Sequence, residues 1–360
     1  MKKISLLVVI VTLVVSLTAC SSGQERQKLY ILNWGEYINE DLVDQFEEEF
    51  SVDVVYEEVG SNEAMYEKIK SGNTKYDIAV PSDYMISKLK QESLLVKIDD
   101  SLLPNLQDVT MNTDVLRMLG EDSDYAVPYF WGTVGLMYNN EHKALVEEHG
   151  YGVIFDSSLV PEDFKVGMYD SARDSVGAAL IYKGYDVNSF KADELADVQK
   201  MLEEFEYTLW GEDNLKIAVI EGNLDVALVY SGDYFDELYV AIDEELDFEY
   251  GYFAPLGTNV WVDGLVIPTT SENTELAHTF INYMVDAENS LENAGYVGYA
   301  PVIDEVFAEI EADEYYDLIV ANNGYRPDFS NPEFKGQAYK YIGKDHDEKL
   351  EEILNKAKAN

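Results

Sequence analysis

Residues 29–81 read LYILNWGEYINEDLVDQFEEEFSVDVVYEEVGSNEAMYEKIKSGNTKYDIAVP, and this stretch decides the fold class. Short apolar runs typical of strands alternate in it with segments whose apolar residues recur every three or four positions, as in a helix. In chain order these segments are residues 29–32, 41–50, 52–56, 62–70 and 76–80. A strand–helix–strand order at this spacing predicts parallel βαβ units and therefore an α/β fold.

The second half of the chain has the same alternation. Strands are expected at 166–169, 226–230 and 260–267, and helices through 180 and at 195–207, 214–222, 274–285 and 349–359. Ligands of open α/β sheets bind beyond the carboxyl ends of the strands. The segments that follow the strands, beginning with 33–37 and 81–84, are therefore the places to search for a site.

The N-terminal residues are expected to lie outside the fold. Two lysines precede an apolar run over 4–17, which is too short to span a bilayer but typical of a signal peptide. The run ends in LTAC, residues 17–20, which resembles a bacterial lipobox. We expect a signal peptide at 1–19, lipidation of Cys20 and a flexible tether over 20–27. The alternative is an ordinary secretory signal followed by a chance cysteine.

The composition of the chain and the motifs that it lacks exclude several classes of function. The formal charge of −45 disfavours nucleic acid as a partner and favours cations, although solubility in a salty medium would also explain it. Cys20 is the single cysteine, so the folded part has no disulfide and no thiol chemistry. The sequence contains no GxGxxG, Walker A, GxSxG or HExxH motif, and its four histidines are scattered. We therefore expect no enzyme activity, no cofactor and no metal.

Several segments that follow predicted strands place aromatic side chains beside carboxylates. They are Trp34/Glu36/Tyr37, Asp83/Tyr84, Tyr230/Asp233 and Trp261/Asp263, and 170–174 adds carboxylates and Arg173. A long alkyl ammonium needs flat apolar walls for its methylenes and carboxylates for its charged ends, and aromatic faces also attract cations. In the alternative interpretation, each aromatic is a core residue and each carboxylate caps a helix.

At these residues the chain resembles the polyamine-binding proteins that serve spermidine/putrescine ABC importers. The resemblance runs from about Leu29 to the C-terminal helix. Its motifs are residues 33–37, 61–66, 76–84, 128–133, 170–174, 229–232 and 261–263. It implies a type II periplasmic-binding-protein fold, in which two α/β lobes joined by a hinge enclose a central ligand cleft. The lobes would comprise 28–133 plus 262–305, and 134–261 plus 306–360.

The resemblance and the aromatic–carboxylate segments together give eleven expected ligand-binding residues. They are Trp34, Glu36, Tyr37, Ser82, Asp83, Tyr84, Asp174, Tyr230, Trp261, Asp263 and Tyr299. Glu36, Asp174 and Asp263 would neutralise the ammonium groups. Ser171 stands where some members have a second aspartate, so the choice between putrescine and spermidine stays open.

The expected function is capture and delivery. A monomeric protein, anchored by lipid to the extracellular face of the cell membrane (or in the periplasmic space of a Gram-negative cell), would bind putrescine or spermidine. It would deliver the polyamine to ABC permease subunits driven by a cytoplasmic ATPase. The alternatives are a protein of the same fold for a quaternary amine or a metal, including iron held by tyrosines, a polyamine sensor, and a secreted enzyme.

Overall fold

The computed structural model describes residues 26–312 and 324–359. The predicted signal peptide and the predicted lipidation site, Cys20, lie outside the described residues. Strand β1 (Gln27–Asn33) starts at Gln27, the last residue of the tether expected over 20–27. Within the described ranges, no helix is long and apolar enough to span a bilayer.

The first third of the chain forms the predicted βαβ units. The elements are β1, α1 (Glu40–Phe50), β2 (Val52–Glu58), α2 (Asn62–Ser71), β3 (Ile78–Ala79) and α3 (Asp83–Gln91). Strand β1 pairs in parallel with β2 on one side and with β3 on the other, which confirms the prediction. Strand β3 is shorter than the predicted 76–80. One reason is that the side chain of Asp77, at 3.0 Å, accepts the hydrogen bond of the Tyr30 N–H that a ladder would use.

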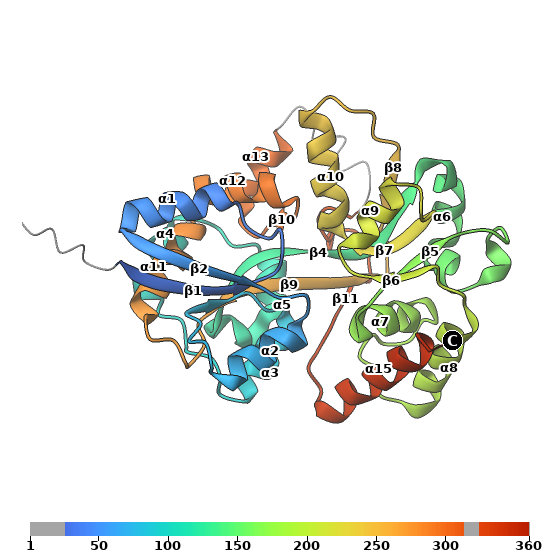
Figure 1. Cartoon of the computed structure of the whole chain (residues 1–360), viewed down its shortest axis with the longest axis horizontal. Helices are drawn as coiled ribbons and strands as arrows, with labels where there is room; N and C mark the ends of the chain where they lie inside the picture. Colours follow the sequence, from blue (N-terminus) through green and yellow to red (C-terminus); the bar gives the residue numbers. More distant parts are fainter. Residues whose placement is uncertain (1–25, 313–323, 360) are drawn as a thin grey trace, which may run out of the picture.

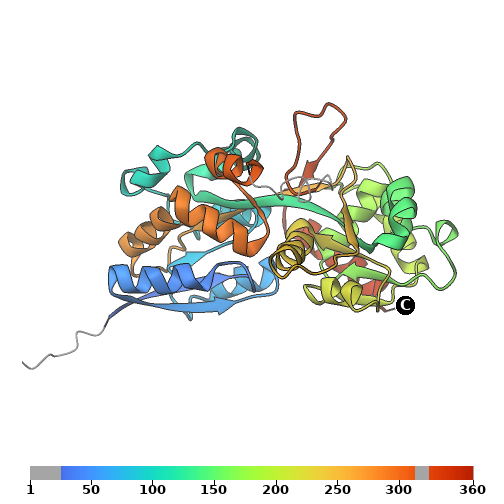
Figure 2. The same ribbon diagram turned by 90° about the horizontal axis from the view of Figure 1, so that it is seen from above.

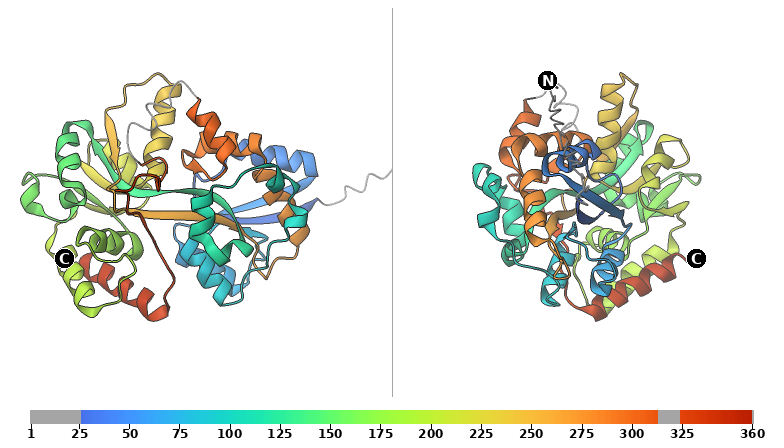
Figure 3. Two further views of the ribbon diagram at one scale, coloured as in Figure 1. Left: turned by 180° about the vertical axis from the view of Figure 1, so that it is seen from behind. Right: turned by 60° about the vertical axis from the view of Figure 1, so that its left-hand side comes forward.

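Two long strands connect the halves of the molecule. Strand β4 (Ala126–Asn139) pairs with the antiparallel strand β9 (Asn259–Val266) up to Thr133, and from Val134 with β7 (Val226–Tyr230) and β8 (Tyr250–Phe253). The main sheet therefore runs β2-β1-β3-β9-β4-β7-β5-β6. Figures 1, 2 and 3 show β4 and β9 running between two bodies, each with helices packed around its strands.

The second body contains the remaining strands of the sheet and their helices. They are β5 (Val166–Tyr169), α7 (Ala172–Tyr182), α8 (Ala192–Glu204), β6 (Leu209–Gly211), α9 (Asn214–Ile220), α10 (Ser231–Asp243) and α15 (Lys344–Ala357). Helix α8 ends at Glu204 rather than 207, because the chain becomes extended at Phe205 and approaches β6. Helix α15 starts five residues earlier than the predicted 349, in a first turn of charged residues with little apolar signal. The predicted α/β fold with two lobes is confirmed.

The remaining elements of the described ranges lie between these. They are the helices α4 (Pro104–Asp108), α5 (Thr113–Leu119), α6 (Lys143–His149), α11 (Thr274–Met284), α12 (Ala287–Val297) and α13 (Asp304–Glu311), the strands β10 (Ala300–Pro301) and β11 (Gln337–Ala338), and the 3-10 turns η1 (Asp100–Leu102), η2 (Gly120–Asp124), η3 (Asn140–His142), η4 (Gly150–Ile154) and η5 (Ser157–Leu159). Helix α13 packs on α12 and β10, which belong to the first lobe. The expected lobe boundary at 305/306 cuts this helix, so we propose that the first lobe extends through Glu311. The change of partner along β4 at Thr133 and Val134 supports the other proposed boundary.

Candidate ligand-binding cleft

The carboxyl ends of strands from both lobes meet at one cleft. Its volume is about 350 Å³, and all eleven residues expected from the sequence line it. Trp34, Glu36 and Tyr37 follow β1, Ser82, Asp83 and Tyr84 follow β3, and Asp174 lies on α7 after β5. Tyr230 is the last residue of β7, Trp261 and Asp263 lie within β9, and Tyr299 directly precedes β10. Other residues line the cleft that the site prediction did not include, among them Glu63, Tyr169, Lys216 and Tyr339.

A chain of aromatic rings forms one wall and connects the lobes. The Tyr299 ring lies edge-on to Tyr37 at 5.3 Å and to Trp261 at 5.2 Å between ring centroids. Trp261 in turn lies edge-on to Tyr230 at 5.6 Å. Gly232 makes this close packing possible, since a Cβ there would lie 2.1 Å from the Tyr299 ring. The wall offers flat apolar surface with hydroxyl groups at intervals.

Two buried carboxylates in the cleft each keep one oxygen without a hydrogen bond. Asp263 Oδ2 accepts from the Tyr37 hydroxyl at 2.8 Å, and Asp83 Oδ1 accepts from the Tyr84 N–H at 2.7 Å. Asp263 Oδ1 and Asp83 Oδ2 are buried and have no partner among the described residues, and the same is true of the Trp261 indole N–H. A buried polar atom without a partner costs about 1–3 kcal/mol, so such atoms call for a ligand.

Burial changes the proton affinity of these carboxylates. It raises the pKa of Asp263 to about 7. Burial, together with the nearby charge of Asp263, raises the pKa of Asp83 to about 8. Asp83 is the first residue of α3, where the helix dipole normally favours a negative charge. The desolvation penalty outweighs that effect here, so these carboxyl groups favour the protonated form, and a bound cation would favour their ionised form.

A third buried carboxylate, Asp174, lies on α7 in the second lobe. Its two oxygens accept from the Tyr230 hydroxyl at 3.0 Å and from the Tyr339 hydroxyl at 3.3 Å. Burial raises its pKa as well, while these hydroxyls and Ser171 lower it. Tyr339 was not predicted. It comes from the segment before α15 and also lies edge-on to Tyr84.

Arg173 brings a fixed cation to the same end of the cleft. Its guanidinium lies 4.1 Å from the Tyr84 ring centroid and pairs with Asp347 of α15. The Tyr84 hydroxyl donates to Glu63 at 3.1 Å. Arg173 is buried and joins α7, α15 and the first-lobe residue Tyr84, which orders this end of the site.

Glu36 already has a partner within the protein. Its carboxylate lies 3.2 Å from the Nζ atom of Lys216, which is buried on α9 of the second lobe and also contacts Asp236 at 2.9 Å. The Glu36 side chain is 74% exposed. We therefore propose that Glu36 forms a contact between the lobes, instead of neutralising a ligand ammonium as the sequence suggested.

Trp34, Ser82 and Asp233 make hydrogen bonds within their own lobes. Trp34 Nε1 donates to the Val80 carbonyl at 2.7 Å, and Ser82 Oγ accepts from the Asn62 amide at 3.0 Å. Asp233 Oδ2 accepts from the Tyr230 N–H at 2.9 Å, at the start of α10. Asp233 therefore serves as a helix cap, as the alternative interpretation of these carboxylates allowed.

Known proteins are similar to this chain over most of its length. The sequence profile of a family described as bacterial extracellular solute-binding protein matches residues 41–318. The putrescine-binding periplasmic protein SpuD of Pseudomonas aeruginosa is 29% identical over 301 residues, which cover 80% of this chain and 82% of that protein.

Solved structures give the same result. The spermidine/putrescine ABC transporter substrate-binding protein PotD of Streptococcus pneumoniae is 30% identical with a TM-score of 0.71, and the match covers 92% of this chain and 99% of that one. The TpPotD lipoprotein of Treponema pallidum is 27% identical with a TM-score of 0.74, over the same shares of the two chains. The chain therefore belongs to the bacterial extracellular solute-binding protein family.

Proposed function

We propose that this protein captures an extended polyamine, putrescine or spermidine, for an ABC importer. The observation that carries the proposal is the pair of buried carboxylate oxygens, Asp83 Oδ2 and Asp263 Oδ1, that have no partner among the described residues. An ammonium group supplies both the N–H donors and the positive charge that these atoms lack.

The rest of the cleft suits an alkyl chain with a second charged end. The ring wall of Tyr37, Tyr299, Trp261 and Tyr230 would pack against methylenes and attract the cationic ends. Asp174 would receive an ammonium at the other end. A buried carboxylate that stays unpaired is costly, so a ligand with too few charges is penalised.

A quaternary amine fits less well. It carries positive charge but no N–H, so it would leave the two partnerless oxygens without hydrogen bonds. The names of the relatives favour the same choice, since SpuD is named for putrescine and PotD for spermidine and putrescine. The proposed role is binding without catalysis, in keeping with the family of solute-binding proteins to which the chain belongs.

We further propose that a lipid at Cys20 holds the protein at the extracellular face of the membrane, beside the permease and its ATPase. The lipobox-like residues 17–20 and the lipoprotein relative from Treponema pallidum support this. A monomer is sufficient, since one chain supplies both walls of the cleft. In cells, Cys20→Ala should release the protein from the membrane fraction, and retention of the variant there would refute the anchor.

A thermal-shift panel tests the ligand. It compares putrescine and spermidine with choline, iron(III), neutral amino acids and 1,4-butanediol, which has the shape of putrescine without its charge. We expect the melting temperature to rise with the polyamines alone. A rise with choline or iron and none with polyamines would replace the proposed ligand. If polyamines bind, unchanged polyamine uptake after deletion of the gene would favour a sensor over an importer.

A further inference from the structure

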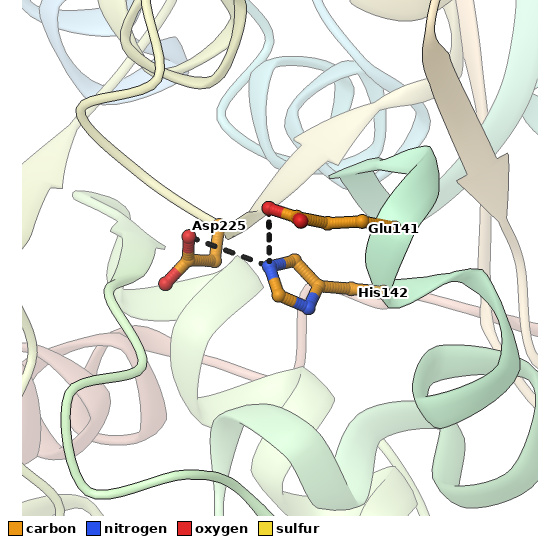
Figure 4. Close-up of side chains that lie close together, drawn as sticks. All are labelled: Glu141, His142 and Asp225. Carbon is orange, nitrogen blue, oxygen red and sulfur yellow. Dashed lines mark ion pairs between the residues drawn. The ribbon is translucent and has the colours of Figure 1, made fainter.

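A cluster of three side chains that could each offer a ligand atom to a metal ion lies outside the cleft. Glu141 and His142 belong to η3, directly after β4, and Asp225 lies directly before β7 (Figure 4). One ligand atom from each of the three lies within 4.8 Å of the others. The cleft is entered from the other end of β7, at Tyr230, so this cluster is a separate site.

The distances fit a shared metal ion better than hydrogen bonds. His142 Nε2 lies 3.5 Å from Glu141 Oε1 and 3.4 Å from Asp225 Oδ1. The Nε2 atom is itself buried and makes no hydrogen bond to any described residue. Ligands held about 2.0–2.2 Å from a tetrahedral zinc ion are about 3.3–3.6 Å apart, which matches the distances from His142 Nε2 to the two carboxylates.

Neighbouring groups hold the ligands in place. Asp225 Oδ2 accepts from the Lys165 N–H at 2.7 Å, which turns Oδ1 toward the histidine. The Asn139 side chain accepts from the Glu141 N–H at 3.2 Å, and the His142 ring lies edge-on to Phe164 at 5.0 Å. Outer contacts of this kind orient the ligands in metal sites. The Glu141 side chain is 70% exposed, which leaves an entry path for an ion and room for a water ligand.

We propose that Glu141, His142 and Asp225 bind one divalent transition-metal ion, with zinc as the best match. Two carboxylates and a neutral imidazole carry the two negative charges that balance it, and nitrogen–oxygen ligand sets suit zinc better than calcium or magnesium. The ion would join the end of β4 to the start of β7 and so stabilise the second lobe. It would not touch the ligand cleft.

Zinc titration of the metal-stripped full chain, followed by equilibrium dialysis and thermal melting, tests the proposal. We expect one tightly bound zinc per chain and a higher melting temperature. His142→Gln and Asp225→Asn should each weaken this binding by more than roughly tenfold. Asp225→Asn keeps an acceptor for the Lys165 N–H, so it preserves the fold. His149→Gln, the same change on neighbouring helix α6, is the matched control and should bind zinc like the wild type.

Two results would overturn the site. One is an absence of zinc binding by the wild type, which would leave the cluster as an ion pair of His142 with two carboxylates. The other is equal zinc affinity in the wild type, His142→Gln and Asp225→Asn. Calcium and magnesium run in parallel should give weaker binding, and tighter binding of either would reassign the metal. Should a variant fold poorly, Glu141→Gln, at an exposed position, still tests the ligand set.

Discussion

Asp263→Asn removes the charge of a carboxylate that we propose binds the ligand ammonium, and it leaves the surroundings of that side chain in place. The asparagine oxygen can still accept from the Tyr37 hydroxyl, which is 2.8 Å from the native carboxylate. Its amide would then replace the partnerless oxygen with a donor, facing the ligand ammonium. Loss of one partner of a buried charge pair costs about 2–5 kcal/mol. At 1.4 kcal/mol per tenfold, putrescine should bind about 30-fold to 4,000-fold more weakly.

Stability should respond differently from affinity. The pKa of Asp263 is about 7 in the folded protein and near 4 in the unfolded chain. Without a ligand, folding therefore favours the protonated form of this side chain. Its contribution to stability therefore falls as the pH rises from about 4 to about 7. Asparagine mimics the neutral acid, so the ligand-free variant should melt no lower than the wild type at pH 8.

Asp77→Asn provides the matched control. Asp77 is also buried, but both its oxygens receive hydrogen bonds, from Tyr30 N–H at 3.0 Å and Ser271 Oγ at 2.7 Å among others. It does not line the cleft. This variant should lose stability and keep its affinity. The assay is calorimetric titration with putrescine at pH 8, and an affinity of Asp263→Asn within threefold of the wild type would refute the reasoning.

Three further predictions concern the surroundings of these carboxylates. Putrescine affinity and the ligand-induced rise in melting temperature should grow from pH 6 to pH 8. The reason is that Asp263 and Asp83, with pKa values of about 7 and about 8, must ionise to bind a cation. Scanning fluorimetry across this range checks the prediction, and a flat profile would contradict it. Glu36→Gln should change affinity less than about fivefold in calorimetry, since it removes only an ion pair with Lys216 in which the Glu36 side chain is 74% exposed; a loss as large as that of Asp263→Asn would restore Glu36 to the carboxylates that bind the ligand. Tyr339→Phe should weaken binding about 2-fold to 10-fold in the same assay, because Asp174 loses a hydrogen-bond donor that lowers its pKa; unchanged affinity would remove Tyr339 from the site.

The sequence predicted the parts of the fold that local pattern determines. Strands β5 and β7 have the predicted bounds, because each is a compact buried run ended by polar residues. Strand β3 and helix α15 were misjudged at their ends, where a hydrogen bond from the Tyr30 N–H to the Asp77 side chain and a charged first turn override the apolar pattern. The aromatic–carboxylate segments and the family resemblance together located the cleft, since all eleven expected residues line it.

What the sequence missed depends on distant partners. Tyr339 lies in an irregular segment and reaches Asp174 across 165 positions. Lys216 pairs with Glu36 across 180 positions, and no local signal indicates that a helix lysine would enter an acidic cleft. The sequence did not reveal the cluster around His142 for the same reason, since Asp225 lies 83 positions further along the chain, directly before β7. Such contacts can be predicted only when the order of the strands in the sheet is known.

Calorimetric titration of putrescine against 1,4-butanediol at pH 8 tests the central claim most directly. The two molecules share a four-carbon chain, and only the diamine can supply positive charge to Asp83 and Asp263. We predict saturable binding of one putrescine per chain and no measurable binding of the diol. Equal binding of both, or of neither, would contradict a cleft built to capture a polyamine.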